Sequence, residues 1–383
     1  MRFCMSKILF SILLGTLFIS TSMFARQPDE PRLISIDVPG AGKGAGVLNC
    51  GNGLIPYCPG TFPLDINKEG EIVGLYLTDP GVYYGFLRYA DGKYVSFSAP
   101  GADTAEGDFN GTYPQSINSS GAVTGIFQGS DEVFHGFVRE PNGSFVIINL
   151  KEAGTAAYQG TFPTSINDRG QVAGVYFDSS NGEHGFLRNC DGSVITFDDP
   201  NANAGTMVAL EEALNSGGAI IGWYNVGNVA YGFLREPDGL FKTIEPDTSS
   251  PFTVVGGINR TSSATGYFAD TSGVLHGFLR KPSGSTAIFD VPGPEAVGGT
   301  AAFTLNASDE ITGVYVDSNN ANHGFVRFPD GAFRTFDAPN IGTASSQGTR
   351  PTTINDAGEV IGFYLDSNNT ARGFLRSPDK CDR

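Results

Sequence analysis

The stretch NGEHGFLRNCDG, residues 181–192, gathers residue types that commonly do chemistry. His184, Arg188, Cys190 and Asp191 lie within eight positions, and a His beside a Cys or an Asp can form a nucleophile–base pair or a metal site. The pattern recurs, however, because every histidine of the chain directly precedes Gly-Phe: His135, His184, His276 and His323. Side chains at one repeat position are spread apart in space, so we expect structural roles here and no catalytic or metal-ligating residue.

A repeat of about 48 residues organises the chain. Gly-Phe-Leu/Val-Arg occurs seven times, and an Asn preceded by Ile or Leu stands upstream of every copy. In residues 160–200 one repeat divides into four β-type segments: TFPTSI, QVAGVYF, HGFLR and SVITFD. The connectors carry Asn-x-x-Gly and Asp-Gly, which suit tight turns. Such a period indicates a repeat architecture.

The segments predict an all-β fold. EIVGLYL (71–77) is apolar on both alternating faces, as in a strand buried on both sides, and its central Gly74 indicates close approach of another backbone. Together the repeats predict a seven-bladed β-propeller of four-stranded blades. The last repeat lacks its fourth strand, whereas LISIDVPGA (33–41) resembles a fourth strand without the other three. We therefore expect the N-terminal strand to close the ring.

The N-terminus predicts export. Residues 1–25 have Arg2 and Lys7 before an apolar run, which is typical of a cleaved signal peptide, with a membrane anchor as the alternative. Residues 26–31 form a short lead, and residues 32–383 form a single propeller domain. We expect a secreted protein, extracellular or periplasmic, with no membrane span after cleavage.

The net charge indicates which classes of partner are disfavoured, and the cysteines indicate possible disulfides. The net charge of −16 becomes about −18 after cleavage, which disfavours nucleic acid and anionic membranes. We expect a monomer without cofactors that binds an extracellular protein or a glycan. Cys50 and Cys58 could close a small disulfide, while Cys190 and Cys381 would be free thiols, or one would pair between chains.

Arginines recur with a polar or acidic residue ten positions later. A constant offset suggests that each Arg pairs with that residue across a hairpin, and Arg376 with Asp37 across the ring closure. The predicted pairs are Arg88–Ser98, Arg139–Asn149, Arg188–Asp198, Arg235–Glu245, Arg280–Asp290, Arg327–Asp337 and Arg376–Asp37.

Ligand-binding candidates lie in the variable loops that we assign to one face of the propeller. Asp178, Asp317 and Asp366 each open an Asp-Ser-x-Asn loop, which could hold Ca²⁺ or simply form a turn. Glu211 and Glu212 are adjacent acids that depart from the repeat pattern. Variable loops on a rigid scaffold are common binding sites.

Catalytic motifs such as Gly-x-Ser-x-Gly and His-Glu-x-x-His are absent from the sequence. The His-Gly-Phe-Leu block, with Ile-Asn-x-x-Gly upstream and a Phe-Asp strand downstream, resembles the bacterial extracellular repeats of the HAF family. That resemblance implies a secreted or surface-exposed repeat protein and no established catalytic residues. We therefore predict a non-catalytic binding module; the alternatives are a secreted carbohydrate hydrolase or lyase, and a structural surface protein.

Overall fold

The computed structural model describes residues 32–44, 58–79, 81–105, 110–210 and 212–378, which contain strands and no helix. In chain order the strands begin with β1 (Leu33–Ile36), β2 (Gly60–Ile66), β3 (Ile72–Leu77), β4 (Tyr83–Arg88), β5 (Tyr94–Phe97), β6 (Gly111–Ile117), β7 (Val123–Gln128), β8 (Phe134–Arg139), β9 (Phe145–Ile148), β10 (Gly160–Ile166), β11 (Val172–Phe177), β12 (Glu183–Arg188), β13 (Val194–Phe197) and β14 (Thr206–Val208). They continue with β15 (Ile220–Val226), β16 (Val229–Arg235), β17 (Phe241–Ile244), β18 (Thr253–Ile258), β19 (Ala264–Ala269), β20 (Leu275–Arg280), β21 (Thr286–Phe289), β22 (Thr300–Leu305), β23 (Ile311–Val316), β24 (Asn322–Arg327), β25 (Phe333–Phe336), β26 (Gly348–Ile354), β27 (Val360–Leu365) and β28 (Ala371–Arg376).

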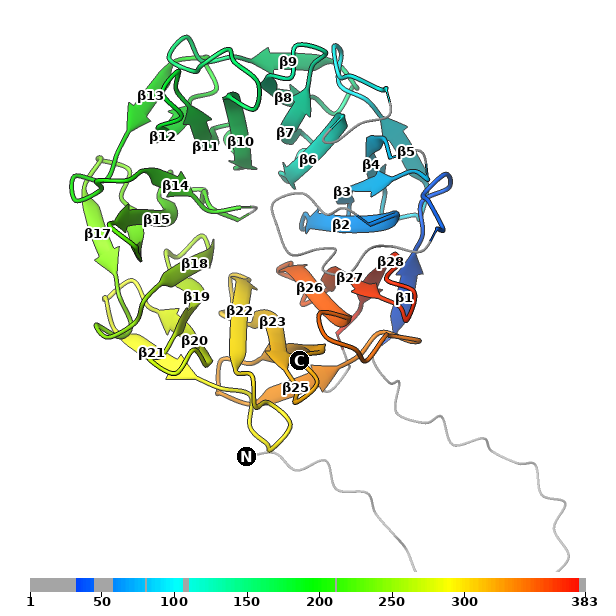
Figure 1. The fold of residues 1–383 in the computed structure, drawn as a ribbon, viewed down its shortest axis with the longest axis vertical. Coiled ribbons are helices and arrows are strands. Elements are labelled where there is room, and N and C mark those ends of the chain that lie inside the picture. Colours follow the sequence, from blue (N-terminus) through cyan, green and yellow to red (C-terminus); the bar gives the residue numbers. More distant parts are fainter. Residues whose placement is uncertain (1–31, 45–57, 80, 106–109, 211, 379–383) are drawn as a thin grey trace, which may run out of the picture. The chain divides into compact units, whose positions relative to one another are not determined.

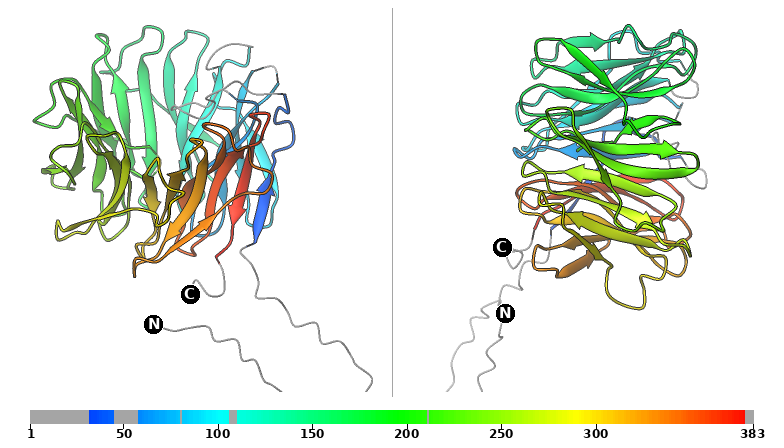
Figure 2. Two further views of the ribbon diagram at one scale, coloured as in Figure 1. Left: turned by 60° about the horizontal axis from the view of Figure 1, so that its bottom comes forward. Right: turned by 90° about the vertical axis from the view of Figure 1, so that its left-hand side faces the viewer.

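Consecutive strands pair in antiparallel runs of four, such as β2–β5, β10–β13 and β14–β17. Figure 1 shows the first strand of each run (β2, β6, β10, β14, β18, β22 and β26) nearest a common axis. The strands β5, β9, β13, β17, β21 and β25 lie on the periphery (Figure 1). From the side, the strands run between two faces on which the turns gather (Figure 2). The arrangement is that of a β-propeller, as the repeat predicts.

Neighbouring runs are joined by few backbone contacts. Most neighbouring runs are connected by a single parallel bridge, such as that of Gly160 in β10 with Phe134 in β8. Through these bridges, twenty strands belong to one sheet. The strands β14–β17 and β18–β21 form separate sheets. At the chain ends, β1 pairs antiparallel with β28, and Gly60 of β2 bridges Ala371 of β28.

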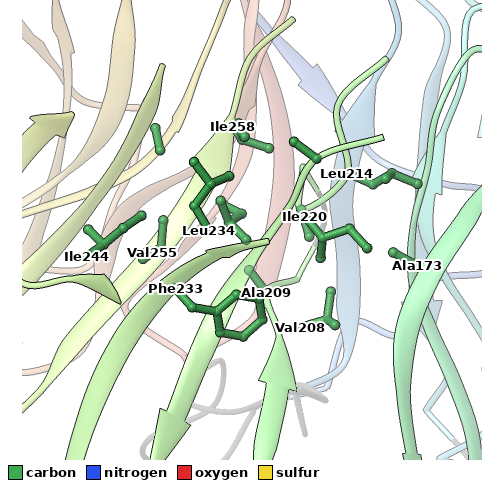
Figure 3. Packing of buried hydrophobic residues seen from close by; sticks show 14 of the residues in the cluster. Ala173, Val208, Ala209, Leu214, Ile220, Phe233, Leu234, Ile244, Val255 and Ile258 are labelled. Carbon is green, nitrogen blue, oxygen red and sulfur yellow. The ribbon is translucent and has the colours of Figure 1, made fainter. Parts of the chain in front are cut away.

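Repeated residues fill the spaces between the runs. The Phe of each Gly-Phe pair is fully buried; the set is Phe86, Phe137, Phe186, Phe233, Phe278, Phe325 and Phe374. Figure 3 shows one such core, in which Ala173, Val208 and Ile258 come from three different runs. A Cβ on Gly74 would clash with the carbonyl oxygen of Phe62 and the ring of Phe86, which confirms the predicted close approach.

The predicted arginine pairs are wrong. In every hairpin the Arg lies opposite the residue six positions later, as Arg188 lies opposite Val194, so a residue ten positions later faces the histidine position instead. This holds for Arg88–Ser98, Arg139–Asn149, Arg188–Asp198, Arg235–Glu245, Arg280–Asp290, Arg327–Asp337 and Arg376–Asp37. A constant offset shows a constant register but does not reveal which residues are opposite, because the turn length sets that.

Histidines take the partners expected for the arginines. The contacts of Nδ1 are His184–Asp198 (3.0 Å), His276–Asp290 (3.0 Å), His323–Asp337 (2.9 Å) and His135–Asn149 (2.9 Å). At the chain ends Arg372 takes this position, and its Nη1 lies 3.9 Å from Asp37. Four of these arginines stack instead on a Phe of the preceding run: Arg139 on Phe97, Arg235 on Phe197, Arg327 on Phe289 and Arg376 on Phe336.

Other expectations concern the chain ends and the cysteines. The signal peptide, the lead to residue 31, Cys50 and Cys381 lie outside the described residues. Cys58 is buried and disulfide-bonded. Because Cys50 is outside the described residues, the pairing of Cys58 with Cys50 stays a prediction. Cys190 is an exposed free thiol. Within the described ranges, no helix has the length and apolarity that crossing a membrane requires.

Candidate functional site

A cavity of about 250 Å³ lies at the ends of the innermost strands. It is lined by the last residues of β2, β6, β10, β18, β22 and β26, by Glu212 and Leu214, and by the Asn turns that follow. It therefore opens on the face that carries these turns, which we call the Asn-turn face. The variable loops lie at the other ends of the strands, on what we call the loop face.

Seven asparagines form a closed hydrogen-bonded ring around the cavity. The Nδ2 of each donates to the backbone oxygen of the next: Asn67 to Asn118, Asn118 to Asn167, Asn167 to Asn215, Asn215 to Asn259, Asn259 to Asn306, Asn306 to Asn355, and Asn355 to Asn67, at 3.0–3.2 Å. Each Oδ1 accepts two N–H groups of its own turn, as Asn67 does from Glu69 and Glu71. The ring therefore fixes the turns relative to one another.

A second belt of hydrogen bonds lies one residue deeper. In most inner strands a β-bulge lies directly before the residue that makes these hydrogen bonds, such as the bulge between Pro63 and Asp65. A bulge changes the direction of the side chain that follows. The N–H of Ile166 donates to Ser116 Oγ (3.4 Å), and the N–H of Leu214 donates to Ser165 Oγ (3.2 Å). A hydroxyl from one repeat thus holds the backbone of the next.

Asp65 holds the belt position that Ser116 and Ser165 hold in the following repeats. Its Oδ2 accepts the N–H of Ile117 and its Oδ1 that of Ile66, both at 2.8 Å. Burial raises the pKa of Asp65 to about 6, although the hydrogen bonds from Ile117, Ser116 and Ile66 oppose this rise. A hydroxyl would serve the backbone equally well, so the carboxyl exceeds what the fold requires. Sequence reasoning missed Asp65, although its place in a Ser/Thr column was a usable signal.

Glu212 lies elsewhere than predicted. The register jumps from Val208 opposite Gly222 to Leu214 opposite Ile220, so Glu212 belongs to an enlarged bulge of an inner strand. It lines the cavity at the Asn-turn face, and its backbone oxygen accepts the N–H of Ile258 (3.1 Å). The variable-loop assignment is therefore wrong for Glu212. Glu211 lies outside the described residues.

The residue after the Asn is charged in four of the seven turns, and these residues, Lys68, Asp168, Arg260 and Asp356, line the cavity mouth. Asp168 Oδ1 accepts the N–H of Ser119 (2.9 Å). Asp356 Oδ1 accepts the N–H of Ala307 (2.9 Å), and its Oδ2 lies 3.6 Å from Arg260 Nη1. Lys68 is exposed at the same mouth. The ring beneath is uniform, whereas these mouth residues differ from repeat to repeat.

The other predicted candidates, Asp178, Asp317 and Asp366, lie on the loop face. The Oδ1 of Asp178 accepts the N–H of Ser180 and of Gly182, both at 2.7 Å, and these bonds lower the pKa of Asp178. Its Oδ2 lies 3.5 Å from His184 Nε2.

Asp317 and Asp366 repeat this arrangement. Asp317 approaches His323 at 3.6 Å, and Asp366 accepts a hydrogen bond from Arg372 Nε at 3.3 Å. These carboxylates therefore serve the turns and the adjacent cations. Within the described ranges, no group of three or more His, Cys, Asp or Glu is arranged to hold a metal ion.

The cavity is lined by hydrogen-bonding groups and by several carboxyl groups. None of the described residues that line it is His or Cys, and the histidines lie on the loop face. The hydroxyls of Ser116 and Ser165 accept backbone N–H groups, and the hydroxyl of Ser116 also donates to the carboxyl of Asp65. Burial raises the pKa of Asp65, which lines the cavity, to about 6. Such a site can bind a small polar group.

The structure is similar to solved β-propeller proteins. It matches streptogramin B lyase over 91% of this chain and 98% of that chain, with TM-score 0.57 and 14% identity. It matches virginiamycin B lyase from Staphylococcus aureus over 91% and 100%, with TM-score 0.55 and 14% identity. The β-propeller domain of the Trilobed protease from Pyrococcus furiosus matches over 82% and 95%, with TM-score 0.50 and 8% identity. At these identities the likeness shows the fold alone.

No family model and no curated protein matches the sequence. The resemblance to the HAF repeats therefore stays a prediction.

Proposed function

We propose that the chain is a secreted, non-catalytic binding module on a seven-bladed β-propeller whose ring is closed by its N-terminal strand. The ring closure is supported by three contacts between the chain ends. Leu33–Ile36 pairs with Gly373–Arg376, Gly60 bridges Ala371, and Asn355 donates to Asn67. Pairing of the first strand with the last removes a free sheet edge at the junction.

The observation that carries the binding function is the axial cavity. A uniform hydrogen-bonded ring fixes its wall, while the exposed mouth residues Lys68, Asp168, Arg260 and Asp356 vary. A rigid frame with variable side chains loses little entropy when a ligand binds. Its partner would be an extracellular protein or glycan that inserts a small polar group. The negative charge disfavours nucleic acid.

Ligand screening of the mature chain, from residue 26 onward, tests this function. The probes are neutral oligosaccharides and soluble cell-wall fragments, followed by thermal shift and calorimetry. A ligand at 100 times its Kd stabilises the fold by about 2.7 kcal/mol. We expect Ala307→Trp, at the half-buried cavity mouth, to abolish the shift, and Ala332→Trp, at an exposed outer turn, to retain it. A shift that survives Ala307→Trp would refute binding in the cavity.

An enzymatic alternative, a carbohydrate hydrolase or lyase, rests on Asp65 and Glu212, which line the same cavity. Glycoside hydrolysis generally requires two carboxyl groups flanking one bond. Chemical change of a bound oligosaccharide, abolished by Asp65→Asn, would establish that alternative in place of the binding module.

A further inference from the structure

Two loops of the loop face, residues 154–160 and 342–348, have the same internal hydrogen bonds. In the first, the N–H of Ala156 donates to Gln159 Oε1 (3.1 Å), and Gln159 Nε2 donates to Asn181 Oδ1 (2.8 Å). In the second, Ala344 and Gln347 repeat these bonds, and Asn369 takes the place of Asn181. Each loop is therefore a natural control for the other.

The two loops differ at one left-handed position. Tyr158 has a φ of 64° and Ser346 a φ of 66°. The N–H of Tyr158 donates to the oxygen of Glu132, and that of Ser346 to the oxygen of Asn320, at 2.9 and 2.8 Å. Left-handed backbone is unfavourable for a bulky residue, and Tyr158 is also 54% exposed. The second loop shows that this conformation does not require an aromatic side chain.

Two exposed polar residues are bonded to the loop that carries Tyr158: the backbone oxygen of Glu132 accepts the N–H of Tyr158, and Asn181 Oδ1 accepts from Gln159. Glu132 is exposed, and its carboxylate has no ion pair or side-chain hydrogen bond among the described residues. Asn181 is exposed, and because its Oδ1 accepts from Gln159, its Nδ2 remains a donor. An aromatic face beside one acceptor and one donor matches a sugar ring, which presents C–H groups on its face and hydroxyls at its edge.

We propose that Tyr158 is the stacking platform of a glycan-binding site, with Glu132 and Asn181 bonding the hydroxyls of the same sugar. Strain at an exposed aromatic residue is an observation from which function can be inferred. The adjacent acids, Asp131, Glu132 and Glu152, exclude an acidic sugar, so the ligand is a neutral oligosaccharide. The site is on the loop face, whereas the axial cavity opens on the Asn-turn face.

This inference rests on the proposed binding function, because it names a partner class and a second contact surface for the module. The experiment therefore separates the two surfaces by variant. Loss of binding in Tyr158→Ser alone assigns the site to the loop face, and loss in Ala307→Trp alone assigns it to the cavity.

Calorimetry and saturation-transfer NMR of the mature chain with cellohexaose, laminarihexaose and chitohexaose test the site. We expect Tyr158→Ser, which installs the residue of the second loop, to weaken binding about tenfold, and Tyr158→Phe to retain it. Val297→Ser, a control at a 56% exposed residue of another loop, should leave the affinity unchanged. The melting temperature of Tyr158→Ser, measured alongside, checks that the variant folds, and Ser346 shows that a Ser adopts this conformation.

Three results would overturn the site. One is equal affinity of wild type and Tyr158→Ser for the bound sugar. Another is absence of binding to all three sugars. The third is binding of a polyproline decapeptide but of no sugar, which would make Tyr158 a peptide contact.

Discussion

The buried carboxyl of Asp65 makes the stability of the protein depend on pH in a calculable way. Burial raises its pKa from 3.8 to about 6. The folded protein therefore holds this proton more tightly than the unfolded chain does. The stabilisation is complete below about pH 4 and is lost as the pH rises through about 6. The difference corresponds to roughly 3 kcal/mol at pH 7.5.

Replacement of Asp65 by the residue of its own repeat column isolates this contribution. Asp65→Ser replaces the carboxyl oxygen that accepts the N–H of Ile117 with a hydroxyl oxygen, as Ser116 and Ser165 provide for their neighbours. At pH 7.5 we expect the variant to unfold about 4 °C above wild type, from roughly 3 kcal/mol and an unfolding entropy of about 2.1 cal/mol/K per residue. At pH 4 the two proteins should melt nearly together.

Scanning calorimetry at both pH values checks this prediction. The reverse variant, Ser165→Asp, adds a second buried carboxyl and should melt below wild type at pH 7.5 but not at pH 4. Other titrating groups cancel in each comparison because the proteins differ at one position. An equal difference between wild type and Asp65→Ser at both pH values would refute the role assigned to burial.

Two further predictions concern the repeated contacts. Burial opposes the charge of His276, but the hydrogen bonds and charges of Asp290 and Asp270 outweigh it and raise its pKa, so this stabilisation is present below about pH 6.5 and is lost as the pH rises through the raised value. His276→Asn should therefore lower the melting temperature more at pH 5.5 than at pH 8.5, and an equal loss at both pH values would contradict this. Asn167→Ala removes one donor and one double acceptor from the ring and should reduce the free energy of unfolding by about 2–4 kcal/mol in denaturant titration. Asn142→Ala, at an exposed hairpin turn, should cost less than about 1 kcal/mol, and similar costs at both sites would argue against the ring.

The features that could be predicted from the sequence are those that depend on residues recurring in every repeat. The Asn turns, the close approach at Gly74 and the pairing of residues 33–36 with the last strand follow from residues that recur at fixed spacing. Spacing alone did not reveal which residues lie opposite in a hairpin. Arg188 and His184 are both at constant offsets from Asp198, and the turn at Asp191 decides in favour of His184.

The site was harder to predict than the fold. The asparagines and the Ile residues before them recur in nearly every repeat and so appeared purely structural, yet their convergence on the axis forms the cavity. Glu212 was assigned to a variable loop because an insertion interrupts its inner strand and hides the register. Departures from a repeat column, such as Asp65, were the better guide.

Native mass spectrometry of the mature chain with the oligosaccharide panel tests the central claim of non-catalytic binding most directly, because it measures complex formation and ligand mass together. The account predicts a one-to-one complex whose released ligand has its original mass after prolonged incubation. A ligand recovered with a cleaved or eliminated bond, and unchanged in parallel incubation with Asp65→Asn, would contradict it.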